Sequence, residues 1–197
     1  MSEPATLDAQ TILLAARDDL RTRFSKLKEQ AESALAQIDD DMFFAESKRS
    51  TGGEGDLSIA VIVQHMAGNL RSRFTDFLTS DGEKTDRNRD GEFVPPPADR
   101  AALMARWDTG WAALFAAFDA VGDDRLGQTI VIRGESHRIF DAFLRQLAHH
   151  AYHVGQIVYL AKHARGADWQ SMSIARGQSA AFEAAMRARF ADDASAS

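Results

Sequence analysis

Residues 146–156 read Gln-Leu-Ala-His-His-Ala-Tyr-His-Val-Gly-Gln and lie in the second half of a long amphipathic segment. On an α-helix, residues four apart differ by about 40° in direction, and their Cβ atoms lie roughly 6 Å apart. His149 and His153 can therefore bind one metal ion from successive turns of a helix. Because one helix face cannot surround an ion, a third ligand has to come from another part of the chain.

His65 is the candidate for that third ligand. It lies in the apolar, helix-patterned run of residues 59–67, which contains no charged residue. Neutral imidazole nitrogens suit zinc or nickel, so the three histidines predict a site for a divalent ion. The alternative is a set of hydrogen-bonded histidines in or beside the core, the commoner role of a histidine on an apolar helix face. His150 and His163 point away from the pair by about 100° and 80° and are expected at the boundary of the core.

Two polar side chains beside the histidines are candidates for supporting roles. Gln156 follows His153 by three residues, and its amide can orient a ligand histidine or a bound water. Asn69 follows His65 by four residues and is expected on the same side of its helix. Gly155 has no side chain and would let a neighbouring helix approach closely.

The histidine pattern resembles that of a known superfamily. The motif His-x-x-x-His-x-Gly-Gln late in one bundle helix, with a single histidine early in the second helix, resembles the metal site of the DinB/YfiT-like superfamily of bacterial helical-bundle proteins. Further segments resemble one uncharacterised branch of it, namely Ser58-Ile59-Ala60, residues 65–70, the loop residues 81–93, Ile132-Arg133-Gly134-Glu135 and residues 173–179. The resemblance covers about residues 7–190.

The resemblance implies a metal-binding four-helix bundle that forms a homodimer. Characterised relatives include metal-dependent thiol S-transferases and a thiol-dependent isomerase. The resemblance therefore implies a low-molecular-weight thiol as co-substrate and a small electrophile as substrate, with Arg176 on the substrate side. No general base is identifiable, so the catalytic residues stay unassigned. The alternative is a bundle that binds a metal or small ligand without turnover.

Composition limits the classes of function. The chain has 197 residues, enough for one domain that buries about 70% of its unfolded surface. It has no cysteine, which excludes disulfides, thiolate ligands and a catalytic cysteine. A net charge of −6, with basic residues interspersed among acids, disfavours nucleic acid as a partner. Without a basic N-terminal flank or an apolar run of about 18 residues, the protein is expected in the cytoplasm and not in a membrane.

The periodicity of apolar residues predicts an all-α fold. We expect a four-helix bundle with helices at about residues 7–38, 57–78, 98–120 and 138–164, in which Thr6 and Asp56 are candidate N-caps of the first two. The β-favouring run at residues 129–132 predicts a small hairpin outside the bundle. An additional C-terminal helix, ending at Phe190, is expected to pack through Phe182, Met186 and Phe190, before a frayed tail of residues 191–197.

The loop at residues 79–97 is long and polar for a compact domain, which is typical of a functional or a disordered segment. Two alternatives follow from its charged residues Arg87, Arg89, Asp90 and Glu92. In the first alternative, these side chains line a mouth above the metal. In the second, they form ion pairs with one another in a solvated loop.

Overall fold

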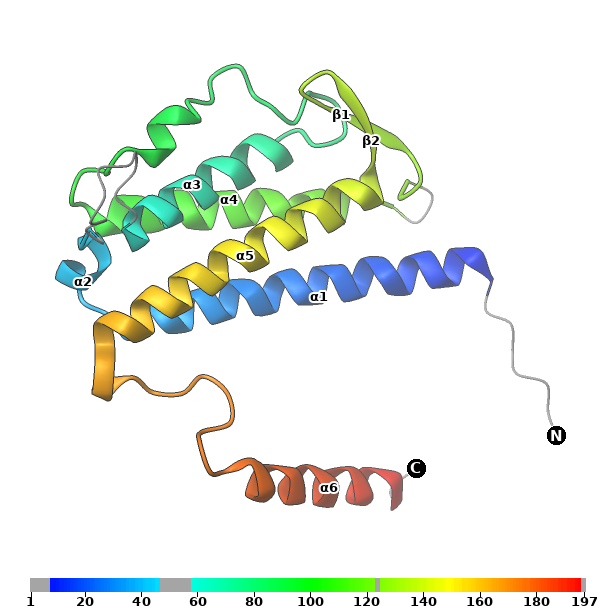
Figure 1. Cartoon of the computed structure of the whole chain (residues 1–197). Coiled ribbons are helices and arrows are strands. Elements are labelled where there is room, and N and C mark those ends of the chain that lie inside the picture. Colours follow the sequence, from blue (N-terminus) through cyan, green and yellow to red (C-terminus); the bar gives the residue numbers. More distant parts are fainter. Residues whose placement is uncertain (1–7, 47–57, 123–124, 196–197) are drawn as a thin grey trace.

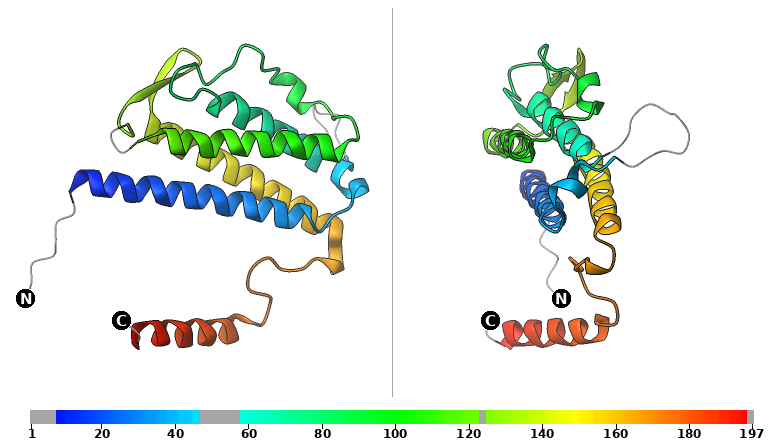
Figure 2. Two further views of the ribbon diagram at one scale, coloured as in Figure 1. Left: turned by 180° about the vertical axis from the view of Figure 1, so that it is seen from behind. Right: turned by 90° about the vertical axis from the view of Figure 1, so that its left-hand side faces the viewer.

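The chain folds into a four-helix bundle, as predicted. The computed structural model describes residues 8–46, 58–122 and 125–195. The bundle consists of α1 (Ala9–Leu35), α3 (Ile59–Phe74), α4 (Arg100–Ala120) and α5 (Ile139–Arg165), shown in Figure 1. Helix α3 packs against α4 and α5, and α1 packs against the other side of α5 and α4, which closes the bundle (Figure 2).

Polar caps determine where these helices begin. The side chains of Asp8, Ser58 and Asp99 accept hydrogen bonds from backbone N–H groups in the first turns of α1, α3 and α4. Such caps satisfy donors that have no partner within the helix. The predicted caps Thr6 and Asp56 lie outside the described residues.

Aromatic side chains fill the centre of the bundle. The rings of Phe118 and Phe143 stack with centroids 4.0 Å apart, and Trp107 and Trp111 are both fully buried. His150 is also fully buried, and its Nδ1–H donates to the Gln146 carbonyl. The expectation of a boundary position for His150 is therefore wrong, because its ring lies against Trp111 in the core, with ring centroids 5.8 Å apart. The hydrogen bond satisfies Nδ1 only, since Nε2 has no partner among the described residues.

Two helix ends differ from the prediction. Helix α1 ends at Leu35, and a short helix, α2 (Asp40–Phe44), follows because Asp39 caps it and Phe43 is buried. Helix α3 ends at Phe74 and not near residue 78, since Thr75 is extended and Asp76 has a φ of 48°. A left-handed residue of this kind cannot continue an α-helix.

The predicted hairpin is present and is attached to the long loop. Strand β1 (Thr129–Ile132) pairs antiparallel with β2 (Glu135–Arg138). Arg133 and Gly134, with φ values of 57° and 76°, form the two-residue turn, as in a type I′ turn. The Asp81 carboxylate accepts hydrogen bonds from the N–H groups of both turn residues, at 2.8 and 2.9 Å.

We expect Asp81→Asn to destabilise the protein at neutral pH. Hydrogen bonds from the backbone N–H groups of Glu83, Gly134 and Arg133 lower the pKa of Asp81 from 3.8 to about 2. A carboxylate with a lowered pKa stabilises the fold above its unfolded pKa, and this contribution is lost as the pH falls through the folded pKa. Urea titrations should show a difference between wild type and variant that disappears between pH 3.8 and about 2. A difference that is unchanged over this range would contradict the prediction.

The C-terminal helix does not pack as predicted. Helix α6 (Ser179–Ser195) follows a short 3-10 helix, η2 (Gly166–Asp168), and an irregular segment that carries it away from the bundle (Figures 1 and 2). Phe182 and Phe190 are 49% and 60% exposed, so the predicted packing is wrong. The helix also continues to Ser195, through most of the predicted frayed tail, since its alanine-rich sequence favours a helix without tertiary contacts. None of the described helices has the length and apolar character needed to cross a membrane.

Candidate metal centre

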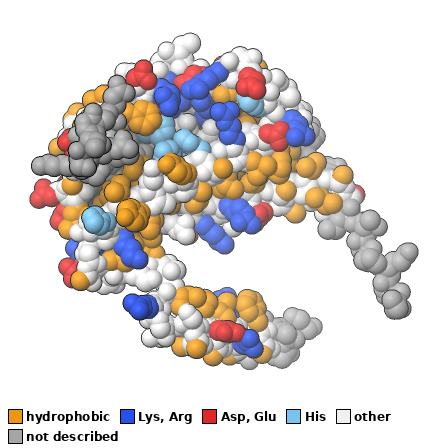
Figure 3. All heavy atoms as spheres, in the orientation of Figure 1, with side chains coloured by type: hydrophobic (Ala, Val, Ile, Leu, Met, Phe, Trp, Pro, Cys, Tyr) orange, Lys and Arg blue, Asp and Glu red, His pale blue; other side chains and the backbone are white. Residues whose placement is uncertain are grey.

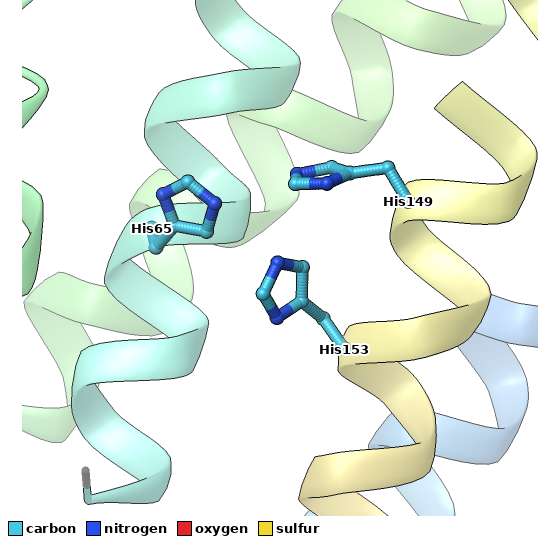
Figure 4. Close-up of side chains that lie close together, drawn as sticks. All are labelled: His65, His149 and His153. Carbon is cyan, nitrogen blue, oxygen red and sulfur yellow. The ribbon is translucent and has the colours of Figure 1, made fainter. Parts of the chain in front are cut away.

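Helices α3 and α5 bring the three predicted histidines together. His65 is on α3, and His149 and His153 are on successive turns of α5 (Figure 4). One ring nitrogen from each lies within 4.8 Å of the others. Ring centroids are 5.4 Å apart for His65 and His149, 4.9 Å for His65 and His153, and 4.6 Å for His149 and His153. A group of three imidazoles at these separations could hold one ion.

Hydrogen bonds leave the Nε2 atoms of the cluster free. His65 Nδ1 lies 2.9 Å from Glu92 Oε2, and His153 Nδ1 lies 2.8 Å from Gln156 Oε1. Since both oxygens accept hydrogen bonds, each Nδ1 carries a proton, and Nε2 is the atom that holds the lone pair in the neutral ring. The Nε2 atom of His149 is buried and has no hydrogen-bond partner among the described residues. Gln156 therefore orients His153 through its side-chain amide, which is one of the two roles considered for it from the sequence.

The electrostatic environment favours neutral histidines. Burial, followed by the proximity of His153 and His65, lowers the pKa of His149 from 6.5 to about 4. Burial also lowers the pKa of His153, and this effect outweighs the hydrogen bond to Gln156, which raises it. A neutral imidazole binds a metal without first losing a proton, so these two rings are in the ligand form at neutral pH.

Glu92 contacts the histidine cluster, and the sequence did not reveal this contact. It lies in the 3-10 helix η1 (Asp90–Phe93), and its side chain is 8% exposed. Arg87 donates to both carboxylate oxygens, from Nε to Oε1 at 2.8 Å and from Nη2 to Oε2 at 2.7 Å. Burial alone would raise the pKa of Glu92, but hydrogen bonds from Arg87 and His65 lower it below its usual value. The carboxylate therefore stays ionised and holds His65 in one tautomer.

The position of η1 on α3 depends on Gln64. Its amide Nε2 donates to the carbonyl groups of Gly91 and Glu92, both at 3.1 Å, and to that of Val94 at 3.0 Å. The Phe93 ring also lies against His65, with centroids 4.6 Å apart. These contacts attach the loop to the helix that carries His65.

Gly68 makes room for the Glu92 carboxylate. A Cβ atom at residue 68 would lie 2.2 Å from Glu92 Oε1 and 2.7 Å from its Cδ atom, closer than real Cβ contacts. A larger residue would push the carboxylate away from His65. Gly155 differs, because a Cβ atom there would meet nothing within 4 Å. The described chain thus brings no helix close to Gly155, contrary to the expectation for that residue.

We expect Gly68→Ala to weaken metal binding by about 10-fold to 100-fold, because a displaced Glu92 no longer orients His65. Gly155→Ala is the matched control, since it adds the same methyl group on α5 without a clash and should leave metal affinity unchanged. Competition with a coloured chelator measures both affinities. Equal affinities for the two variants would contradict the role of Gly68.

Four candidate residues remain, and they differ in burial and in the partners of their side chains. Arg87 is 3% exposed and pairs with Glu92, as the second alternative for the loop expected, but this pair is buried and not solvated. Arg89 is 52% exposed and lies over the Phe93 ring at 5.2 Å. Asn69 is buried one turn after His65, and its Oδ1 has no described partner. Arg176 is exposed in the segment before α6, which leads away from the bundle (Figure 1).

The histidine cluster reaches the surface of the bundle. His149 and His153 are partly buried, and Figure 3 shows histidine side chains near the centre of this face, with hydrophobic side chains beside them and Lys or Arg side chains above. Among the described residues, both side chains are therefore partly exposed.

Comparison with known proteins identifies one matching family. A family model described as "Protein of unknown function (DUF1572)" matches residues 15–178. The matched region contains all three histidines, Glu92 and the helices that carry them. No curated protein and no solved structure matches the chain.

Proposed function

The chain belongs to the DUF1572 family, whose function is unknown, and we propose from its site that it binds one divalent metal ion through His65, His149 and His153. The observation that carries the proposal is the convergence of three imidazoles whose Nε2 atoms are free, one of them buried without a hydrogen-bond partner. A buried polar atom without a partner is costly, and a bound ion would supply that partner.

Zinc or nickel fits this donor set best. The ligands are three imidazole nitrogens, and the chain contains no cysteine to provide a thiolate. The Glu92 carboxylate behind His65 is the partner that metal-bound histidines commonly have. Three protein ligands would leave a further position for water or substrate, as in catalytic zinc sites.

We infer further that the family is a branch of the DinB/YfiT-like superfamily. Two features support this, the four-helix bundle and the placement of one histidine on the second bundle helix and two on the fourth. The inferred activity is that of a metal-dependent transferase or isomerase, in which a low-molecular-weight thiol reacts with a small electrophile.

Each part of the site has a role in this proposal. When bound, the ion would act as a Lewis acid or lower the pKa of a thiol or water. The three histidines hold the ion and do not move protons, because the lone pair that would accept a proton is donated to the metal. Glu92 and Gln156 orient His65 and His153. The thiol comes from a co-substrate, since the protein has no cysteine of its own.

Thiol consumption tests the activity. Purified protein should accelerate the reaction of a small thiol with an electrophile such as 1-chloro-2,4-dinitrobenzene, in which a carbon–sulfur bond forms and chloride and a proton are released. The rate enhancement should vanish with a chelator and return with zinc or nickel. Enhancement that survives chelation would contradict a metal mechanism.

A non-catalytic metal-binding or ligand-binding bundle is the second candidate function. It is favoured by the burial of His149 Nε2 and by the engagement of Glu92, the carboxylate that contacts the cluster, with both Arg87 and His65. Stoichiometric metal without metal-dependent turnover of a broad panel of thiols and electrophiles would support it.

The homodimer and the cytoplasmic location stay predictions from the resemblance and from composition. Light scattering checks the first, since the mass of one chain is 21.7 kDa and a dimer has twice that mass.

A further inference from the structure

A cavity lies beside the candidate metal centre. Its volume is about 670 Å³, and it is bounded by α3, α4 and the loop residues 86–92. None of the three histidines lines it. On α3, Gln64 faces this cavity and lies about 100° around the helix from His65. The Glu92 side chain borders the cavity and contacts His65, so it separates the two sites.

The charged groups of the cavity leave one positive charge without a partner. Arg71 pairs with Asp86 at 2.5 Å, and Arg87 pairs with Glu92 at 2.7 Å. The third arginine, Arg106, extends from the exposed side of α4, and no residue within the described ranges forms an ion pair with it. After these pairings, the lining carries a net charge of one positive unit.

The cavity also offers a hydrogen-bond donor and an unfilled interior. The Asn88 side-chain oxygen accepts from the Gly91 N–H at 3.0 Å, and the described residues supply no acceptor for its amide nitrogen. The small residues Ala67, Gly68 and Ala105 form part of the lining and leave the interior empty. A volume of about 670 Å³ lies in the range of pockets for small molecules.

We propose that this cavity is a binding site for a small organic monoanion with a carboxylate group. The groups without partners are an exposed guanidinium and an exposed amide N–H, so a ligand that pairs with both supplies acceptor atoms and one negative charge. Arg106 binds the carboxylate, Asn88 donates to it, and the body of the ligand covers the small residues. The Arg87–Glu92 pair forms the wall towards His65, so a ligand in this cavity does not coordinate the ion.

Benzoate is a suitable probe, with uncharged benzamide as its control. In a ¹⁵N-resolved NMR titration of the full chain, benzoate should shift the amide signals of Ala67, Gly68 and Ala105 in a saturable way, with a Kd of about 1 mM or below, and benzamide should not. No saturable shift at up to about 20 mM benzoate would overturn the proposal.

Variants identify the groups responsible. Arg106→Ala should weaken benzoate binding about tenfold, since a charge-assisted hydrogen bond is lost. Ala105→Leu should also weaken binding, because the larger side chain occupies the cavity without a change in charge. Arg189→Ala, which removes an exposed arginine from α6, should have no effect. Binding by Arg106→Ala with wild-type affinity would overturn the assignment.

Benzoate bound at the metal would give a different result. The double variant His149→Ala, His153→Ala removes two of the proposed ligands but leaves the lining of the cavity intact. It should keep the shifts at Ala67, Gly68 and Ala105. Loss of benzoate binding in this variant would place the anion at the ion and overturn the proposal, whereas failure of metal binding in the wild type would leave the cavity site unaffected.

Discussion

Replacement of His149 or His153 by alanine should reduce the bound divalent metal from about one ion per chain to near zero, because two imidazoles and water cannot substitute for three converging nitrogens. The bundle should stay folded, since both side chains lie at the partly exposed edge of α5 and not in its aromatic core. Metal analysis after gel filtration and the far-ultraviolet circular dichroism spectrum measure the two outcomes.

His163→Ala is the matched control for this experiment. His163 lies on the same helix, is exposed and stacks on Tyr159, so its loss removes an imidazole without touching the cluster. This variant should keep the full metal content. Stoichiometric metal in the double variant His65→Ala, His149→Ala would show that the ion, if present, is bound elsewhere.

Glu92→Gln should have two separable effects. The first is a loss of metal affinity of about 10-fold to 100-fold, because the neutral amide no longer holds His65 in the ligand tautomer as a carboxylate does. The second is a loss of about 3 kcal/mol of stability, because the buried Arg87 guanidinium loses its bidentate partner. The remaining partner of Arg87 is Glu83, at 3.4 Å.

A double variant separates the two effects. Arg87→Met combined with Glu92→Gln removes the buried charge along with its partner, so most of the stability should return. Glu83 keeps its ion pairs with Arg73 and Arg133 in this variant. Metal affinity should stay low, since His65 still lacks its carboxylate. Urea denaturation and chelator competition measure the two quantities. A single variant Glu92→Gln with wild-type metal affinity would contradict the orienting role of Glu92.

The helices, the hairpin and the pairing of His149 with His153 could be predicted because each depends on neighbours in sequence. A period of 3.6 residues places both histidines on one face of α5 wherever that helix packs. The run Thr129–Ile132 and the glycine at position 134 favour a strand and a tight turn without help from the bundle. The prediction of His65 as the third ligand required more, namely an apolar helix-patterned run and the resemblance to a metal-binding bundle. The structure places His65 beside the pair.

The contact between Glu92 and His65 could not be read from such patterns. It joins residues 27 apart, and it needs the loop to turn back along α3, Gln64 to hold η1 there, and Gly68 to leave space for the carboxylate. The separation of α6 from the bundle and the complete burial of His150 could not be predicted for the same reason. Periodicity assigns a residue to a face of a helix. Which loop or helix covers that face depends on the path of the chain through space, and this path is set by the packing of all four helices together.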